Sequence, residues 1–210
     1  MNRCDFLPSG CKAPDVGAVI LAGGEGRRMG LRAKPLLAHG GKAFLEQIAS
    51  QLAGFPEVLL SVNSRERYDA FGLTAVDDIF PNCGPVGGIY SALFRCTSPW
   101  LLVVGCDMPL FTRELVEYLA RQVEDSYDAV VSVTREGRLH PLCAVYHKRV
   151  ADVLRQQILA GEFRLLDVLT RLRIKEISLE KNGFCDSMMC NVNTLEEYKK
   201  LVSATEAEDM

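Results

Sequence analysis

Continuous apolar runs alternate along this chain with segments whose apolar residues recur at helical spacing. Val16–Leu21 has no polar interruption, which is typical of a strand buried on both faces of a sheet. Residues 44–52 instead place their apolar side chains on one face of a helix. Strand and helix signals that alternate in this way predict a mostly parallel sheet covered by helices.

The same pattern continues to the end of the chain. Further strands are predicted at residues 57–62, 73–76, 100–104, 128–133, 141–146 and 174–179. Further helices are predicted at residues 65–71, from about 89, and at 112–123, 149–159, 165–172 and 195–202. The stretch between the third and fourth strands, residues 81–88, is rich in turn residues and is predicted as a loop. We therefore expect a single-domain, three-layer α/β sandwich over residues 16–202, with a mostly parallel twisted sheet and helices on both faces. A flexible leader at residues 1–15 and a disordered tail at residues 203–210 would flank it.

Composition narrows the class of protein. The chain is 48% hydrophobic and 24% charged, an ordinary globular composition. Its formal net charge of −3 excludes the overall basic field that drives non-specific nucleic-acid binding, so any anion site must be local. No apolar run approaches the ~20 residues needed to span a bilayer, and residues 1–15 lack the apolar core of a signal peptide. A cytoplasmic protein without nucleic-acid or membrane partners is expected.

The eight cysteines are irregularly spaced and include no Cys-x-x-Cys pair. Structural zinc and a disulfide framework are therefore not indicated. Several of these cysteines lie in apolar runs, where a reduced thiol behaves as a small hydrophobic side chain.

A glycine- and cation-rich loop, residues 22–35 (AGGEGRRMGLRAKP), follows the first apolar run directly. Glycine lets a ligand approach bare backbone N–H groups, and successive N–H groups form a nest for anions. The cations Arg28 and Lys34 add fixed positive charge. A purely structural turn gains little from clustered like charges, so the loop predicts a polyphosphate site.

Two common phosphate-binding motifs do not fit this chain. Gly40–Lys42 is followed by Ala43, which has no hydroxyl for Mg²⁺, so a Walker A loop is excluded. A dinucleotide fingerprint would need a glycine at Met29, and no acid ends a second strand at the distance that a ribose requires.

Polar residues stand where several predicted strands end. Asn63, Asp78 and Asp107 each follow an apolar run, and ligands of open α/β sheets collect beyond the carboxyl ends of strands. Asp107 alone could equally be a turn residue, but beside a phosphate loop it is predicted to bind Mg²⁺, which takes one or two carboxylates plus phosphate oxygens. His140 and His147 are interpreted as structural, since no motif places a nucleophile beside them.

Five short motifs, in this order and spacing, give the chain a family resemblance. They are Leu21–Gly24 with Arg28–Gly30 and Lys34, then Gly84–Gly88, Cys106–Pro109, His140–Pro141 and Asn191–Thr194. Together they resemble the molybdenum cofactor guanylyltransferases of the MobA type, over about residues 16–201. The departures are Val86, where the family commonly has leucine, and the leader, which has no counterpart.

The resemblance implies a Rossmann-like nucleotidyltransferase fold and an activity. GMP would be transferred from GTP to the terminal phosphate of molybdopterin, giving the guanine dinucleotide cofactor and pyrophosphate. Mg²⁺, or alternatively Mn²⁺, is implied as the metal, bound by Asp107. Other partners would be proteins that deliver or collect the cofactor.

The same resemblance assigns roles to individual residues. The nucleotide-binding positions are Leu21, Ala22, Gly23, Gly24, Lys34, Asn63, Asp78 and Asp107. Asn191 and Asn193 match a motif on the pterin side. The catalytic set combines Asp107 with Arg28 and Lys34, which would offset charge on the leaving pyrophosphate.

Three alternatives remain open. Cytidylyltransferases of this fold tend to have Ala-Ala-Gly where this chain has Leu-Ala-Gly-Gly. Sugar-phosphate nucleotidyltransferases tend to have threonine in place of Arg28. A non-catalytic nucleotide-binding protein would more readily have lost Asp107.

Overall fold

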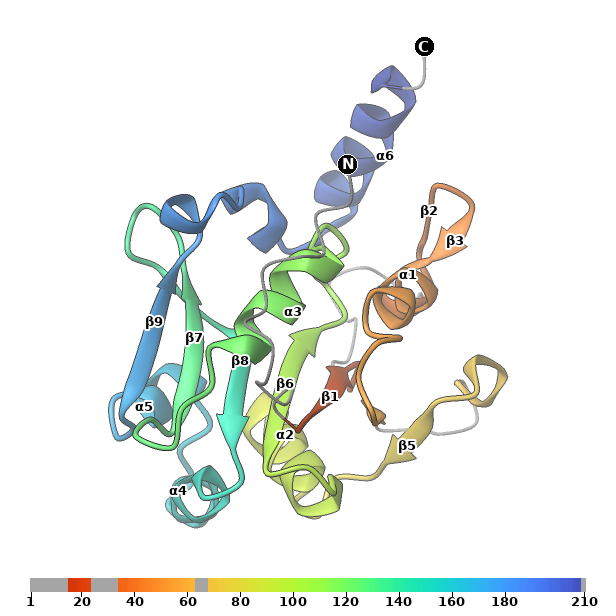
Figure 1. Ribbon diagram of the computed structural model, residues 1–210. Helices are drawn as coiled ribbons and strands as arrows, with labels where there is room; N and C mark the ends of the chain where they lie inside the picture. The colour runs from red at the N-terminus through yellow and green to blue at the C-terminus, as the bar shows by residue number, and fades with distance from the viewer. Residues whose placement is uncertain (1–14, 24–33, 63–67, 209–210) are drawn as a thin grey trace.

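The computed structural model describes residues 15–23, 34–62 and 68–208, apart from the side chains of Lys34, His39 and residues 204–208. Within these residues, seven strands form one sheet that carries helices on both faces (Figure 1). The leader at 1–14 and most of the glycine-rich loop lie outside the described residues, and Asp15 accepts a 2.6 Å hydrogen bond from the Ser98 hydroxyl.

The sheet has the strand order β5-β4-β1-β6-β8-β7-β9. Its members are β1 (Val16–Leu21), β4 (Val58–Ser61), β5 (Thr74–Val76), β6 (Trp100–Gly105), β7 (Ala129–Val133), β8 (Leu139–His147) and β9 (Ile174–Ser178). All neighbouring pairs are parallel except the two that involve β8, which runs antiparallel to β6 and β7. The predicted mostly parallel sheet is therefore confirmed, and the direction of β8 is the exception.

Alternate residues of the central strands point into two separate cores. Ala18 and Ile20 of β1 pack on one face, against α1 (Phe44–Gln51) and α3 (Arg113–Arg121). Val19 packs on the other face, against α2 (Gly84–Arg95), α4 (Val150–Leu159) and α5 (Leu165–Leu169). Because both faces are covered, β1 reads in sequence as one continuous apolar run.

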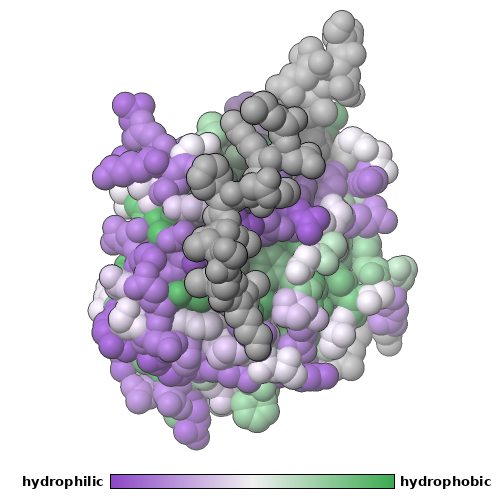
Figure 2. Space-filling model, viewed as in Figure 1, coloured by the Kyte–Doolittle hydropathy of each residue, from purple (hydrophilic) through white to green (hydrophobic). Residues whose placement is uncertain are grey.

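The last strand of the sheet is β9, and within the described residues its outer edge pairs with no other strand. Its Lys175 and Glu176 are partly or fully exposed, and Lys175 Nζ lies 2.6 Å from a carboxylate oxygen of Glu124. Hydrophilic residues predominate on this side of the molecule in Figure 2. Charged residues on an edge strand hinder pairing with another chain.

The carboxyl-terminal helix α6 (Leu195–Glu208) packs beside the first helix. A small third core joins Leu37 and Phe44 to Val192, with Tyr198 of α6 against it. The Tyr198 hydroxyl donates to the carbonyl of Ala38 in a two-stranded hairpin, β2 (Ala38–His39) and β3 (Lys42–Ala43). These contacts hold the end of the chain over the same edge of the sheet towards which β1 and β6 point (Figure 1).

Several predicted boundaries are wrong. Helix α2 begins at Gly84, inside the stretch predicted as a loop, and β8 extends to His147. Of the short helix predicted at 65–71, the described part is the 3-10 turn η4 (Asp69–Phe71). Helix α6 continues to Glu208, beyond the expected end at residue 202, so much of the segment expected to be a disordered tail is helical. That segment contains alanine and glutamate, which favour helix.

Short 3-10 turns complete the described chain. They are η2 (Lys34–Leu36), η5 (Glu180–Asn182) and η6 (Asp186–Met189). The last two lie between β9 and α6 and were not predicted, because three or four residues are too few to show a periodic pattern.

Candidate active site at the carboxyl edge of the sheet

The carboxyl ends of β1, β4 and β6 meet at one edge of the sheet. Leu21 and Gly105 are register partners, and the Cys106 amide donates a 3.1 Å hydrogen bond to the Leu21 carbonyl. On the other side, the Ala22 amide donates a 2.9 Å hydrogen bond to the Ser61 carbonyl. After β1 the chain continues to β4 on one side of the sheet, and after β6 it continues to β7 on the other side. The strand order therefore reverses between β1 and β6. Ligands of open α/β sheets bind at such a point.

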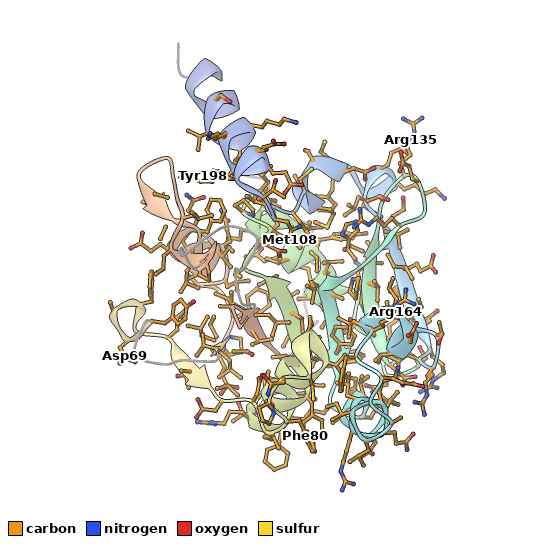
Figure 3. The ribbon with its side chains drawn as sticks, turned by 180° about the vertical axis from the view of Figure 1, so that it is seen from behind. Asp69, Phe80, Met108, Arg135, Arg164 and Tyr198 are labelled. Atoms are coloured by element: carbon orange, nitrogen blue, oxygen red, sulfur yellow. The ribbon has the colours of Figure 1, made fainter. Side chains whose placement is uncertain are left out.

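Asp107 stands in the turn that follows β6, and its side chain is partly exposed. Its carboxylate folds back over Gly105, where an added Cβ would lie 2.6 Å from Asp107 Oδ1. The same Cβ would lie 3.6 Å from the Cβ of Leu142 in β8. Glycine at position 105 therefore leaves the space that the carboxylate occupies, near the end of β6 and the first residues of β8. Figure 3 shows the neighbouring Met108 at this end of the sheet, with Tyr198 on one side and Arg135 on the other.

Asp78 follows β5 and is held by the first turns of α2. The next residue, Ile79, donates its amide to Ser91 Oγ at 2.9 Å, and this buried hydroxyl donates in turn to the Gly87 carbonyl at 2.8 Å. Burial raises the pKa of Asp78, repulsion by Asp77 raises it further, and the Ser61 hydroxyl partly offsets both effects. Among the described residues, Asp78 Oδ1 is buried without a hydrogen-bond partner.

Helix α2 approaches the ends of β1 and β4 closely because it has glycine at position 88. A Cβ added there would lie 2.8 Å from Ser61 Oγ, 3.3 Å from Leu21 Cδ2 and 3.8 Å from Asp78 Oδ1. The glycines of this motif thus let the helix pack against the strand ends, and Val86 beside them is fully buried. The structure thereby brings Leu21, Ala22 and Asp78 to one region.

The segment that precedes α6 reaches the same edge. The Val192 amide donates a 2.7 Å hydrogen bond to the backbone carbonyl of Asp107. Asn191, on one side of Val192, has a buried Oδ1 without a partner among the described residues. On the other side, the amides of Asn193 and Thr194 both donate to Glu197 Oε2, at 2.6 and 2.9 Å.

Thr194 caps the last helix as the sequence predicts. The Glu197 amide donates to Thr194 Oγ1 at 3.2 Å, and the Glu197 carboxylate returns to the amides before the helix, which is a capping box. The cap fixes the end of the Asn191–Thr194 motif and leaves the Asn191 side chain for another role.

Several predicted site residues fall outside this description. Gly24, Arg28 and Asn63 lie outside the described residues, and Lys34 begins η2 with a side chain that is not described. Gly23 follows Ala22 at the end of β1 and is partly exposed. The described part of the site therefore comprises the strand ends, Asp78, Asp107 and the segment around Asn191.

The two histidines read as structural differ in their surroundings. His147 lies at the opposite edge of the sheet, where its Nδ1 accepts hydrogen bonds from the Arg149 amide and Nε at 3.0 and 2.8 Å. Its ring meets Trp100 edge to face, with centroids 4.8 Å apart. His140, by contrast, starts β8 at the edge that carries Asp107, and sequence reasoning missed this placement because it depends on the direction of β8.

At this edge of the sheet, Asp107 is a residue that suits the binding of a metal ion. Among the described residues, no cluster of three or more His, Cys, Asp or Glu side chains could bind a metal ion. Mg²⁺ does not need such a cluster, because it is commonly bound by one or two carboxylates together with substrate phosphates and water. The partly exposed carboxylate of Asp107 suits that mode.

Comparison with known proteins places this geometry in a family. The sequence profile of the MobA-like NTP transferase domain matches residues 18–176, a range that runs from within β1 to within β9. The chain belongs to the MobA-like NTP transferase family. This membership accounts for the fold.

Relatives of this family resemble the chain over almost its whole length. A protein of Clostridium perfringens named probable molybdenum cofactor guanylyltransferase is 34% identical over 90% of this chain and 97% of its own. A protein of the same name from Bacillus velezensis is 34% identical over 90% of this chain and 96% of its own. The crystal structure of molybdopterin-guanine dinucleotide biosynthesis protein A from Archaeoglobus fulgidus superposes with a TM-score of 0.79, at 25% identity, over 91% of this chain and 99% of that one.

In the part of the chain that the structure describes, none of the helices combines the length and apolar character needed to cross a membrane.

Proposed function

We propose that this MobA-like protein transfers GMP from GTP to the terminal phosphate of molybdopterin and releases pyrophosphate. The names of relatives 34% identical over 90% of the chain support this activity. The observation that carries the proposal is the hydrogen bond between Val192 and Asp107, because it joins the two sides of the site. The end of β1, which opens the glycine-rich loop, is hydrogen-bonded to Cys106 beside Asp107, and the Asn191 segment is hydrogen-bonded to Asp107 itself.

The reaction is a displacement at the α-phosphorus of GTP. An oxygen of the molybdopterin phosphate forms the new bond to this phosphorus, and the bond to the oxygen that bridges the α- and β-phosphates breaks. Pyrophosphate leaves with the electron pair of that bond. The second pKa of a phosphate monoester is near ~6, so the nucleophile is already anionic at neutral pH. The protein has no need to remove a proton from it.

The contribution of the protein is then to position both substrates and to offset their charge. Backbone amides of the glycine-rich loop that follows Ala22 would bind the GTP phosphates, as in other glycine-rich anion nests. Arg28 and Lys34 would offset charge on the departing pyrophosphate. Asp78, beside the end of β1, is the described carboxylate best placed to contact the nucleoside part of GTP.

Asp107 would hold Mg²⁺, or Mn²⁺ in its place, at the GTP phosphates. When bound, the ion supplies charge neutralisation at the transferring phosphate. Asn191 and Asn193 would then lie on the pterin side, since their segment is tied to the Asp107 turn. Both substrates are phosphorylated small molecules of biosynthesis, and we propose the cytoplasm as the location.

A screen of the four nucleoside triphosphates tests the proposal. Pyrophosphate release is measured with purified protein, Mg²⁺ and molybdopterin, and the dinucleotide product is identified by mass spectrometry. GTP-dependent formation of the guanine dinucleotide is expected. A preference for CTP would favour the cytidylyltransferase alternative, and turnover with a sugar phosphate in place of molybdopterin would favour the sugar-nucleotide alternative. Binding of GTP without product from any acceptor would indicate a non-catalytic protein.

A further inference from the structure

The start of β8 contains an irregularity at the edge that carries Asp107. Val131 of β7 pairs with Ala144, but the next residue, Ser132, pairs with His140. The intervening residues of β8 therefore bulge out of the ladder with β7. On its other side β8 stays in register with β6 as far as Cys143, which pairs with Val104. Bulges of this kind are enriched beside active sites, where they redirect a side chain.

Two buried hydroxyls hold the bulge in place. Ser132 Oγ donates a 2.7 Å hydrogen bond to the Cys143 carbonyl, which has lost its place in the ladder with β7. The Tyr146 hydroxyl donates a 2.8 Å hydrogen bond to the Pro141 carbonyl. A buried carbonyl without a partner costs about 1–3 kcal/mol, so these bonds stabilise the bulged conformation. The bulge is therefore a specific structure that fixes the residue at its start, His140.

The imidazole of His140 is buried but has an unused polar atom. Its side chain is 7% exposed, and His140 Nε2 has no hydrogen-bond partner among the described residues. Burial lowers the pKa of His140, and so does Arg138, while Asp186 acts in the opposite direction. The imidazole is thus favoured in its neutral form, in which one ring nitrogen donates a hydrogen bond and the other accepts one.

A second unused polar atom lies on a segment that contacts Ser132, the β7 residue whose hydroxyl holds the bulge. Ser132 Oγ is 3.6 Å from Met189 Sδ in η6, and Asn191 follows shortly after Met189. Asn191 Oδ1 is also buried without a partner among the described residues. His140 and Asn191 therefore come from two segments that meet over the end of β7, and both present neutral groups.

We propose that His140 binds the acceptor substrate through its Nε2 atom, by a hydrogen bond to the uncharged heterocycle of that substrate. This inference rests on the proposed function for the identity of the acceptor. The carboxyl edge would then be divided in two. The phosphates of the nucleotide would bind at the end of β1, where the chain supplies backbone amides and cations. The heterocycle would bind at the start of β8, where the protein supplies neutral hydrogen-bonding atoms.

The neutral character of this half favours a heterocycle over a phosphate. A phosphate dianion is best bound by charged donors, and a neutral buried imidazole supplies none. Amide and ring-nitrogen groups of a heterocycle match both a histidine nitrogen and an asparagine oxygen. An acceptor that satisfies the two buried atoms would also remove the unfavourable free energy of leaving them unpaired.

Variants at position 140 test the proposal by steady-state kinetics. His140→Phe keeps a planar ring and removes the polar atom, whereas His140→Gln keeps a polar atom near the position of Nε2. His140→Phe should raise the KM for molybdopterin about tenfold or more, leave the KM for GTP within about twofold, and keep the melting temperature. His140→Gln should recover part of the loss. Equal effects of the two variants, or an equal rise in both KM values, would overturn the proposal.

Nuclear magnetic resonance of the unaltered protein tests the contact without relying on activity. The chain has only three histidines, so labelled imidazoles give few signals, and the His140→Gln spectrum assigns the one of His140. Molybdopterin alone should shift this signal and leave that of His147 in place, and GTP alone should shift neither. A shift by GTP alone, or none by bound molybdopterin, would refute the assignment. If no molybdopterin binds at all, as judged by its fluorescence, the proposed function itself fails and the inference falls with it.

Discussion

The backbone amide of Val192 donates a 2.7 Å hydrogen bond to the carbonyl of Asp107, although the two residues are far apart in sequence. Asp107 belongs to the turn after β6, and Val192 lies between the two asparagines that precede α6. The bond fixes the position of Asn191 and Asn193 relative to the carboxylate proposed to bind metal. A shift of either segment is therefore transmitted to the other.

Asp107 itself gives the most direct test of the metal assignment. Asp107→Ala should lower turnover on the order of 10²–10³-fold, because a group that stabilises charge in the transition state is lost. Asp107→Asn should retain GTP affinity at high Mg²⁺ better than it retains turnover. Pyrophosphate release is measured across a Mg²⁺ titration. Asp125→Ala, an exposed acid before β7 at the opposite edge, is the control and should behave as the unaltered protein. Near-normal activity of Asp107→Ala would exclude Asp107 as the metal ligand.

A single added methyl group at Gly105 should act on the same carboxylate. The Cβ of Gly105→Ala would lie 2.6 Å from Asp107 Oδ1, so the carboxylate must move while the fold remains. Misplacing a reacting group by about 1 Å can cost up to about 10²-fold in rate. We expect a lower kcat and a higher Mg²⁺ requirement at an almost unchanged melting temperature.

The matched control for that substitution lies at the other end of β1. In Gly17→Ala the new Cβ would lie 2.6 Å from Cys96 Sγ, a clash of the same size with the tip of another side chain. It should change stability as much as Gly105→Ala does and leave kcat unaffected. If both variants lose activity equally, the effect of Gly105→Ala comes from general strain.

Asp78→Asn should make the protein more stable and less active. The folded-state pKa of Asp78 is raised above its ordinary value of 3.8. The protonated side chain contributes favourably to the free energy of unfolding, and this contribution is complete below pH 3.8. It is lost as pH rises through the folded-state pKa, so the ionised carboxylate destabilises the fold at pH 7. The variant should melt at a higher temperature than the unaltered protein at pH 7, and the difference should vanish below about pH 4. Its KM for GTP should rise. An unchanged KM would remove Asp78 from the nucleotide site.

Asp128→Asn should show the opposite dependence on pH. Hydrogen bonds from Arg173, at 2.9 and 3.1 Å, lower the pKa of Asp128 below its ordinary value of 3.8. The stabilisation is present above pH 3.8 and is lost as pH falls through the folded-state pKa. At pH 7 the variant should melt about 2–4 °C lower, as a loss near 1 kcal/mol would give in a chain of this size. Kinetics should stay normal, because Asp128 lies at the edge opposite Asp107. A stability difference that grows towards acid pH would contradict this account.

The central strands could be predicted from the sequence because burial on both faces leaves a direct signal. Val16–Leu21 has the predicted bounds, and β6 differs by one residue at Gly105. The strand-end positions of Asp78 and Asp107 followed from the same pattern. Parallel strands bring their carboxyl ends together whatever the detailed topology, so the region of the site was predictable as well.

Other features depend on contacts between distant residues, which no local pattern reveals. Helix α2 was expected to start near residue 89, because glycine and proline usually interrupt helices. In the structure Gly87 and Gly88 are helical. Their lack of a side chain is required by packing, because a larger residue at either position would collide with Phe80 or Ser61. The pairing of Ser132 with His140 is likewise invisible in sequence, and so the environment of His140 was not predicted.

The antiparallel direction of β8 has a consequence for how relatives of this protein could diversify. Strand β8 begins at the edge that carries Asp107, directly after the short turn at Arg135–Arg138. The parallel strands begin at the opposite edge and end at this one. Insertions and deletions in a surface turn are tolerated far better than changes in a buried strand. Acceptor preference could therefore change through this turn, while the nucleotide half of the molecule stays the same.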